Sequence, residues 1–517
     1  MEPTPEPATP PWLEPFRRYV PLAVWIIVAL TLLLIPLKII GYDFLPGDDA
    51  LRAAGKAVSG KTWQQILVLD DVYKIDHEYG WSLLLAKVHS ALHLDADGLV
   101  IFSVVSLFVL AGLTAVPWLR YPEAWLVVLT VGMITGVMIP YRLLIGRPYI
   151  ITVAMLVSLL FLWRRFGSAR PKWWMAAVMT ALIAASVYFH GTWYLWALPV
   201  AAFFLAGEFC WGFTLVGCWI GGVFLGSLLT GHLLGYPMQA IQVVLLATGK
   251  HLTQRTLVTE LQPQGGDMSA LYLLGGLLLL RLVTNLPGRP FLRDPVFWLV
   301  CLTWALAFRV GRFWADWGWP ALLVLLAWDL QTLLSHRFAL DSFRRLALAA
   351  GAALVAFLAI TSDVGGRWTA SLTQQYLTAD NPDIQGWLPD QDGIFYSTDM
   401  SLFYQTFYKN PHGNWRYILG FEPTLMRPED FDVYHKVLWN FGDSKAYTPW
   451  LLKMKPADRL VIRGGRGSPP SIPQLDWNYG VSGIWVGRLP QHRSGDAPAT
   501  VTNTASMAGL TNSPAEK

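Results

Sequence analysis

Charge is scarce in this sequence. Only 14% of its 517 residues are Asp, Glu, Lys or Arg, whereas a soluble globular domain carries about 25%. The 39 Lys and Arg residues barely outnumber the 35 Asp and Glu residues, so the net charge is only +4. A nucleic-acid-binding protein concentrates basic charge on one face, and this balance speaks against such a protein.

Cysteine is scarce as well. The three residues Cys210, Cys218 and Cys301 all lie within apolar stretches. An odd number without a Cys-x-x-Cys motif offers neither a disulfide framework nor a zinc site, and we interpret the three as small buried apolar side chains. The sequence also lacks a Gly-rich nucleotide loop and a solenoid repeat, which disfavours an ATP-driven pump.

Apolar residues are abundant, at 54% of the chain, with a mean hydropathy of +0.40. The first long run, 20–40, exceeds the core of a signal peptide and lacks a small-x-small cleavage site, so we expect a retained transmembrane helix. The predicted fold class is mainly α, a polytopic membrane protein with about eleven transmembrane helices of about 17–25 residues. The other ten are expected near 99–118, 122–141, 146–163, 173–189, 192–207, 211–234, 269–286, 295–309, 315–334 and 344–362.

The basic residues of short loops predict the orientation, because they gather on the cytoplasmic side of a membrane. With a cytoplasmic N-terminus, the loops after the fourth, eighth and tenth helices all fall on that side. They carry Arg164, Arg165, Arg170, Lys172, Arg281, Arg289, Arg293, Arg337, Arg344 and Arg345. We therefore expect segments 42–98 and 363–517 to face outward, which in the inner membrane of a Gram-negative bacterium is the periplasm.

Composition divides the chain into four regions. Residues 1–19 form a cytoplasmic segment, 20–362 the transmembrane domain and 363–490 a small periplasmic α/β domain, and the tail 491–517 has the composition of a disordered segment. In the α/β domain we expect strands at 393–397, 459–462 and 483–487 and helices near 401–408 and 429–441. The aromatic residues at helical spacing favour a buried helix face over a platform that stacks on sugars; they are Phe403, Tyr404, Phe407 and Tyr408.

Paired carboxylates follow the first transmembrane helix, where Asp48 and Asp49 precede Arg52. One interpretation is structural: Asp48 caps a helix, Asp49 lies in its first turn, and Arg52 pairs with a carboxylate one turn away. The other is chemical: a carboxylate at the boundary between water and lipid acts as a general base. Both can hold, because a cap also fixes the position of the next carboxylate.

Several basic residues lie at outward helix ends and break the charge rule. They are Arg142, Arg147, Lys250, His251, Arg255, Arg309 and Arg312. Either their side chains extend to the membrane interface, or they bind a fixed anion such as a lipid phosphate, which a guanidinium group holds bidentately.

The order of these motifs resembles the GT-C membrane glycosyltransferases, in particular the bacterial relatives of the dolichyl-phosphate-mannose protein mannosyltransferases and the lipid A aminoarabinose transferases. The stretch Asp48-Asp49-Ala-Leu-Arg-Ala-Ala is similar to the acidic pair and helix of the family's first outward loop. The later motifs follow in the family's order: Gly60 to Trp63, the amphipathic helix after Trp81, Gly146-Arg147-Pro148-Tyr149, and His190 before Leu195 to Pro199. The resemblance covers residues 20–210. One departure is Asp76-His77-Glu78-Tyr79, where the family often has Lys-Pro-Pro or His-Pro-Pro.

The resemblance implies that a sugar passes from a polyprenyl-phosphate carrier to an acceptor on the outer face, with inversion. Asp48 matches the first acid of the family's pair and is the expected general base, with Asp49 as the alternative base or as the group that orients Asp48. Ligands of the donor phosphate are expected among Arg147, Arg142, His77, Arg309 and Arg312. Further pocket candidates are Arg52, Asp76, His190 and Tyr149.

The expected partners are the polyprenyl-phosphate-sugar donor, membrane lipids and an acceptor that is a protein, a lipid or a glycan. The family resemblance also implies that the C-terminal domain covers the active site and helps to choose the acceptor. Some relatives bind a divalent metal through the acidic pair, which makes such an ion a candidate cofactor, but the oxygen ligands here are too loosely arranged to predict a metal site.

Two other functions compete with this prediction. A transporter or flippase for a lipid-linked or anionic substrate would need polar or broken helices at midmembrane depth, and the one clear intramembrane candidate is Asp329. A non-catalytic membrane scaffold would bind a partner through the C-terminal domain, and Asp48 would then be dispensable.

Overall fold

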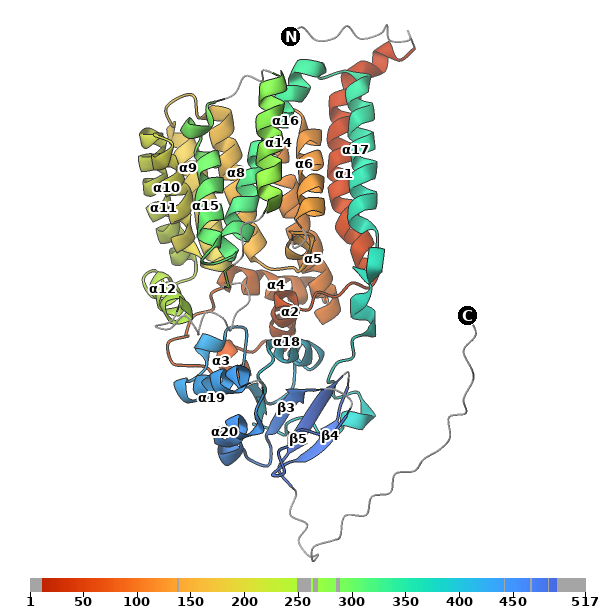
Figure 1. Ribbon diagram of the computed structural model, residues 1–517, viewed down its shortest axis with the longest axis vertical. Helices are drawn as coiled ribbons and strands as arrows, with labels where there is room; N and C mark the ends of the chain where they lie inside the picture. The colour runs from red at the N-terminus through yellow and green to blue at the C-terminus, as the bar shows by residue number, and fades with distance from the viewer. Residues whose placement is uncertain are drawn as a thin grey trace, which may run out of the picture.

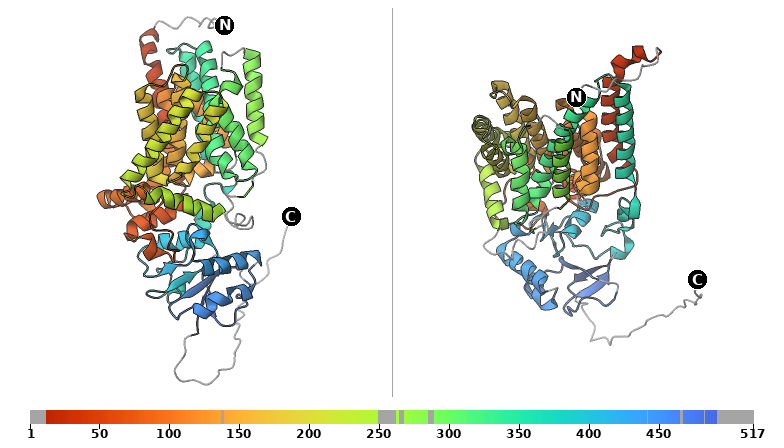
Figure 2. Two further views of the ribbon diagram at one scale, coloured as in Figure 1. Left: turned by 90° about the vertical axis from the view of Figure 1, so that its left-hand side faces the viewer. Right: turned by 45° about the horizontal axis from the view of Figure 1, so that its top comes forward.

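A computed structural model of the chain describes residues 12–136, 139–248, 262–263, 268–284, 289–440, 442–464, 467–481 and 483–490. The long axis of the molecule runs from a bundle of helices to a small domain that contains a β-sheet (Figure 1). The beginning of the first helix and the sheet lie at opposite ends of this axis (Figures 1 and 2). The expected disordered tail 491–517 and the basic residues Lys250, His251 and Arg255 lie outside the described residues.

Seven segments among the described residues are long and apolar enough to cross a membrane. They are Glu14–Ile40, which includes α1 (Val20–Ile40), Ala96–Trp118, which includes α5 (Ala96–Leu113), α8 (Tyr149–Phe166), α9 (Trp173–His190), α11 (Phe209–Leu229), Trp314–Arg337, which ends with α16 (Trp319–Arg337), and α17 (Phe343–Thr361). The chain is therefore a mainly helical integral membrane protein, as its composition predicts.

Four shorter apolar segments of 10–17 residues lie where the remaining spans are expected. They are α6 (Pro122–Thr135), Trp193–Leu205 with α10 (Ala197–Leu205), α14 (Met268–Thr284) and α15 (Pro295–Ala307). By length alone these helices do not qualify as spans, so the total of eleven and the GT-C arrangement stay predictions.

Ion pairs connect the helices at the end of the bundle where α1 begins. Arg345 of α17 donates from Nε and Nη2 to the carboxylate of Glu123 in α6 at 2.5 and 3.1 Å, and both side chains are fully buried. Arg281 makes the same two-point contact with Asp329 at 2.5 and 3.0 Å. Arg164 lies 2.5 Å from Asp294. Basic residues that predict the orientation thus also join neighbouring helices.

The C-terminal domain has a five-stranded sheet in the order β2-β1-β3-β5-β4. The strands are β1 (Ile394–Tyr396), β2 (Arg416–Tyr417), β3 (Arg459–Arg463), β4 (Asp476–Tyr479) and β5 (Ile484–Arg488), and the helices are α18 (Met400–Lys409), α19 (Pro428–Trp439) and α20 (Thr448–Lys453). Strands β2, β1 and β3 are parallel, and β5 and β4 complete the sheet in antiparallel pairing. The three expected strands and two expected helices are confirmed, and the aromatic residues of α18 are buried as expected.

The segment after α1 forms α2 (Asp49–Ser59), α3 (Trp63–Ile66) and α4 (Tyr79–Leu92). This segment lies between the bundle and the C-terminal domain (Figures 1 and 2). Leu67 pairs in parallel with Tyr417 of β2, and the Val68 N–H donates to the Tyr417 carbonyl at 2.9 Å. The segment after α1 therefore extends the edge of the sheet that the C-terminal domain forms.

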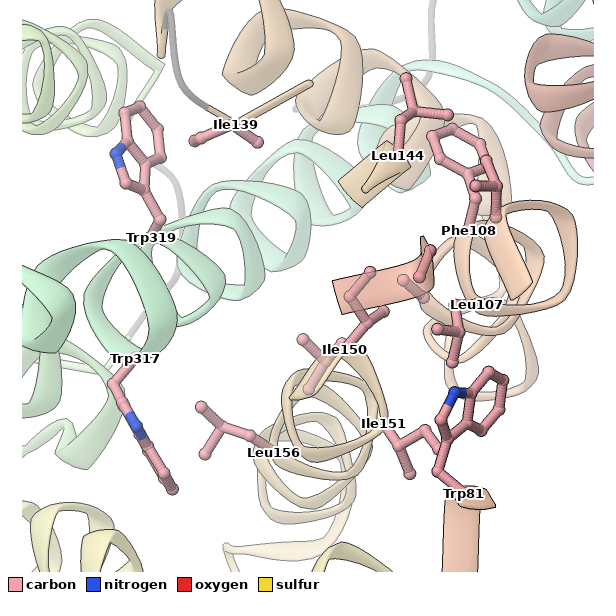
Figure 3. Close-up of a cluster of buried hydrophobic side chains, with 14 of the residues drawn as sticks. Trp81, Leu107, Phe108, Ile139, Leu144, Ile150, Ile151, Leu156, Trp317 and Trp319 are labelled. Atoms are coloured by element: carbon pink, nitrogen blue, oxygen red, sulfur yellow. The ribbon is translucent and has the colours of Figure 1, made fainter. Parts of the chain in front are cut away.

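The same loop also packs into the bundle. Trp81 of α4 is buried and points toward Leu107 of α5 and Ile151 of α8 (Figure 3). Because one face of the loop contacts spanning helices and the other contacts the sheet, its side chains are held between two rigid bodies.

Candidate active site

The acidic pair lies at the start of α2. Asp48 is the N-cap residue, and its carboxylate accepts a hydrogen bond from the Asp49 N–H at 2.7 Å. Asp49 lies in the first turn and accepts from Arg52 Nε at 2.7 Å. Both parts of the structural interpretation are therefore confirmed. The cap also fixes the position of both carboxylates between the bundle and the C-terminal domain, and the role of a general base stays a prediction.

Arg147 contacts both carboxylates. Its Nη2 donates to Asp48 Oδ2, and its Nε lies 3.1 Å from Asp49 Oδ2. Gly146, which precedes Arg147, adopts a φ of +68°. It also packs so close to α2 that a Cβ atom at this position would lie only 2.9 Å from the Ala50 Cβ. Only glycine combines that backbone conformation with so close an approach, so the Gly-Arg-Pro-Tyr motif has a structural reason.

A buried chain of charges continues from the acidic pair. Arg52 is 2% exposed and donates from Nη2 to Glu78 Oε1 at 2.8 Å. Burial raises the pKa of Asp49, but the guanidinium groups of Arg52 and Arg147 lower it further, so it lies below the ordinary value. Burial raises the pKa of Glu78 to about 7, against the lowering effect of Arg52. Two carboxylates on one guanidinium group therefore differ in their affinity for a proton.

His77 lies beside this chain. Tyr73 accepts a hydrogen bond from the His77 backbone N–H at 3.2 Å and contacts His77 Nδ1 at 2.8 Å. The other ring nitrogen of His77, Nε2, lies 3.6 Å from Glu78 Oε1. Burial and then Arg52 lower the pKa of His77 to about 4, so this imidazole is neutral at pH 7.

Asp76 has a structural environment. Its carboxylate accepts from Lys56 Nζ, from Ser82 Oγ at 2.7 Å and from the Glu78 N–H at 3.0 Å. Burial raises the pKa of Asp76, but Lys56 and His77 lower it more, so the carboxylate is ionised at neutral pH. Asp76 therefore fixes the turn that presents His77 and Glu78.

A second group of charges surrounds Asp316, in a π-helical turn (Trp314–Gly318) that precedes α16. Arg142 Nη2 donates to one carboxylate oxygen, and Arg312 Nε donates to the other at 2.9 Å. Arg312 also lies 5.3 Å from the centre of the Tyr149 ring. A π-helical turn re-aims side chains and is common at functional sites.

Aromatic rings join the two groups. The Tyr149 ring is 4.9 Å from the His190 ring, which is 6.2 Å from the His77 ring. The Tyr149 hydroxyl is buried and has no hydrogen-bond partner among the described residues. An unsatisfied buried hydroxyl is rare and gives this wall of the site one free donor.

A narrow cavity of about 70 Å³ begins at these charges and runs between α6, α8 and α16. Its polar lining consists of Arg142, Arg147, Tyr149 and Asp316. The rest of the lining is almost wholly apolar and includes Trp125, Leu129, Ile150, Val153, Val157, Trp319 and Leu323. The cavity therefore places two guanidinium groups and one carboxylate beside an apolar wall.

The C-terminal domain contributes Phe421, which sequence reasoning missed. Its ring lies 4.5 Å from the Arg52 guanidinium carbon and 5.1 Å from the His77 ring. Trp63 of the first loop contacts the same ring at 5.0 Å. Phe421 is more than 300 positions from these partners, so no local signal in the sequence could have found it.

The structure brings together every predicted site residue except Arg309. Arg309 follows α15, is exposed, and has no side-chain contact with the cluster among the described residues. The residues that the prediction left out are Lys56, Tyr73, Glu78, Asp316 and Phe421. Glu78 had a signal, because it directly follows the Asp76-His77 pair.

The carboxylates of this site do not fit a divalent cation in the arrangement described. Within the described ranges, no three Asp, Glu, His or Cys side chains converge as metal ligands. Asp48 and Asp49 instead face Arg147 and Arg52.

Neither a model of a known protein family nor a curated protein matches the sequence.

Proposed function

We propose that the protein is a membrane glycosyltransferase that moves a sugar from a polyprenyl-phosphate donor to an acceptor on the outer face of the membrane. The observation that supports this most directly is that Arg147 contacts the carboxylates of Asp48 and Asp49 and, together with Arg142, lines an apolar cavity between helices of the bundle. A lipid phosphate needs cations beside an apolar groove, and glycosyl transfer to a hydroxyl needs a carboxylate next to that phosphate.

In this proposal, Arg147 and Arg142 bind the donor phosphate, and the first carbons of its chain lie along the apolar lining. Both guanidinium groups line the cavity. A guanidinium group binds phosphate oxygens in pairs and stays charged at every relevant pH. As the bond from sugar to phosphate breaks, negative charge grows on the phosphate, and these groups stabilise the transition state.

Asp48 takes the proton of the acceptor hydroxyl. The oxygen then attacks the anomeric carbon from the face opposite the phosphate, and the electron pair of the broken carbon–oxygen bond leaves with the lipid phosphate. Asp49 lies between the guanidinium groups of Arg52 and Arg147, which lower its pKa and make it a weak base. The Asp48 side chain is also the more exposed, at 24% against 16%.

The remaining residues hold these groups in place. Arg52 ties Asp49 to Glu78, and Phe421 covers Arg52 from the side of the C-terminal domain. Supporting contacts of this kind keep reacting groups in a productive geometry.

The rival transport function has weaker support. Its intramembrane candidate Asp329 forms a two-point ion pair with Arg281. A charge that is neutralised in this way joins α14 to α16, which accounts for Asp329 as a contact between helices.

The decisive experiment is mass spectrometry of the lipids that co-purify with the wild type and with Asp48→Asn in mild detergent. We expect a polyprenyl phosphate in both samples, with the sugar-loaded form enriched in the variant because transfer is blocked. Asp95→Asn is the matched control, since Asp95 is an exposed N-cap residue of α5 in the same loop. If folded protein of all three kinds carries bulk phospholipid alone, the proposal fails.

A further inference from the structure

A second cavity, of about 660 Å³, lies in the C-terminal domain. It is formed by the segment 375–383, β4 and the turn that follows β4. Its lining consists of Gln375, Tyr376, Asn381, Asp383, Asn478, Tyr479, Gly480 and Val481. Unlike the cavity at Arg147, this cavity has a mainly polar lining and belongs to the domain that contains the sheet.

The lining side chains share one chemistry. Gln375, Asn381 and Asn478 each offer an amide that both donates and accepts hydrogen bonds, and Asp383 offers a carboxylate that accepts two. Tyr376 and Tyr479 add aromatic rings with polar tips. Neighbouring hydroxyls on a sugar ring each donate and accept, and the C–H face of the ring packs on an aromatic ring. Lys and Arg are absent from the described lining, so the cavity does not select for an anion.

The walls of the cavity are held before any ligand binds. Asn410, at the end of α18, donates to the Leu377 carbonyl at 2.8 Å and accepts from the Ala379 N–H at 2.8 Å. Asn478 donates to the Asp383 carbonyl at 2.9 Å. Because side chains of the domain fix both sides of the cavity, little conformational entropy is lost on binding.

The cavity is also connected to the acidic pair through packed helices. Asn410 terminates α18, and α18 packs against α2. The two helices approach so closely that a Cβ on Gly55 would lie 3.1 Å from Cδ1 of Phe407. Asp48 is the cap of that same α2. A ligand in the cavity therefore has a fixed position relative to the acidic pair.

We propose that this cavity binds a hydroxyl-rich, uncharged segment of a glycan. The assignment of this glycan as part of the acceptor rests on the proposed glycosyltransferase function, whereas glycan binding by the cavity does not. The acceptor would extend from this cavity toward Asp48, so that the C-terminal domain selects a glycan chain rather than a lipid.

An extended peptide is the main competitor, because β4 is an edge strand and an edge can add a strand. The Asn478 side chain donates to the Asp383 carbonyl, which fixes the short helical turn Pro382–Ile384 beside β4. A peptide would bind through the backbone of the edge, whereas the lining side chains offer the hydrogen bonds that a glycan uses.

The test uses saturation-transfer difference NMR on the full chain in lipid nanodiscs. The probes are chitohexaose, mannohexaose and cellohexaose, and the competitor is an octapeptide of alternating Ser and Thr. We expect saturation of at least one hexasaccharide by the wild type. We expect the dissociation constant to rise by about tenfold in Asp383→Ala, because a charged hydrogen-bond acceptor is lost. Gln375→Ala should weaken binding to a smaller extent.

Gln385→Ala is the matched control, since Gln385 is exposed, close to Asp383, and outside the lining. The proposal is overturned if none of the hexasaccharides binds, if Asp383→Ala and Gln385→Ala bind equally, or if only the peptide binds. Asp48→Asn separates this proposal from the previous one. Glycan binding by that variant, together with a wild type that carries no polyprenyl phosphate, would keep the glycan site and remove the glycosyltransferase.

Discussion

The two ends of the helix bundle use the same residue types in different ways. At the end where α1 begins, Arg345 and Glu123 form a fully buried pair in which one cation satisfies one carboxylate. At the other end, Arg147 contacts two carboxylates, and a second guanidinium, that of Arg52, is shared in turn between Asp49 and Glu78. The Arg345–Glu123 pair, in which each charge has one partner, stabilises a contact between helices. In the cluster around Arg147 and Arg52 the charges share partners and are partly exposed, so they can exchange these partners with a ligand.

The largest expected effect tests whether the Asp48 carboxylate acts in the reaction or only stabilises the fold. Asp48→Asn should reduce transfer by about 100-fold or more, because a general base contributes factors of that size. The fold should survive, because Asn caps a helix as well as Asp does. The rate is measured by mass spectrometry as release of polyprenyl phosphate from the co-purified donor. Asp95→Asn should keep the wild-type rate, and a wild-type rate in Asp48→Asn would refute the assignment.

A substitution in the Arg345–Glu123 pair should give the opposite result, a loss of stability without a loss of the transfer rate. Glu123→Gln leaves the Arg345 guanidinium buried without a counter-charge, which costs about 3–5 kcal/mol. We expect a clearly lower midpoint of thermal unfolding in detergent and an unchanged rate for the protein that remains folded. The control is Glu14→Gln, which removes an exposed carboxylate 3.6 Å from Arg17 and should leave the midpoint unchanged. If Glu123→Gln loses transfer activity while its unfolding midpoint is unchanged, the buried pair is not purely structural and the contrast between the two ends of the bundle fails.

A conservative change sharpens the role of Arg147. Arg147→Lys keeps the charge but loses the planar fork that binds two oxygens at once. We expect the KM for the lipid donor to rise about tenfold, with a smaller change in kcat, because a bidentate charged contact is lost. Arg293→Lys, at an exposed position just before α15, is the control. Equal kinetics for the two variants would remove Arg147 from the phosphate site.

The smallest expected effect is the pH dependence of stability. The pKa of Glu78 is raised to about 7 in the folded protein from 4.5, so the native state binds more protons than the unfolded state between these values. Glu78 therefore stabilises most below pH 4.5, and this contribution is lost as the pH rises toward 7. His77, lowered from 6.5 to about 4, acts in the opposite direction.

These two slopes can be separated by substitution. Glu78→Gln should make thermal stability rise more steeply between pH 5 and pH 7 than in the wild type, and His77→Gln should make it fall. Unfolding midpoints at pH 5, 6 and 7 measure both slopes. Parallel curves for all three proteins would contradict the charge assignment of this cluster.

Local patterns predicted a large part of the fold. Hydropathy located the spanning helices, and the spacing of Asp48, Asp49 and Arg52 predicted both the cap and the ion pair. Hydropathy could not detect the interruption at Gly136, which separates α6 from α7 (Ile139–Leu144) within one expected span. The two residues of β2 are likewise too few for a periodic signal.

Contacts between distant segments could not be predicted. Glu78 lies 26 residues from Arg52, and Asp316 lies 174 residues from Arg142. Each pair forms because helices that are far apart in the chain pack together. The residue types indicated an anion site, but their partners depend on tertiary structure.

The pairing of Leu67 with Tyr417 joins a segment that is synthesised early to one that is synthesised late. The segment after α1 is synthesised early, yet strand β2, which pairs with it, and the Phe421 ring, which covers Arg52, follow all the candidate spanning helices among the described residues. An unfinished chain therefore holds its acidic pair without the outer wall of the site. Biosynthesis itself delays the appearance of a complete site until the C-terminal domain has emerged and folded onto the loop.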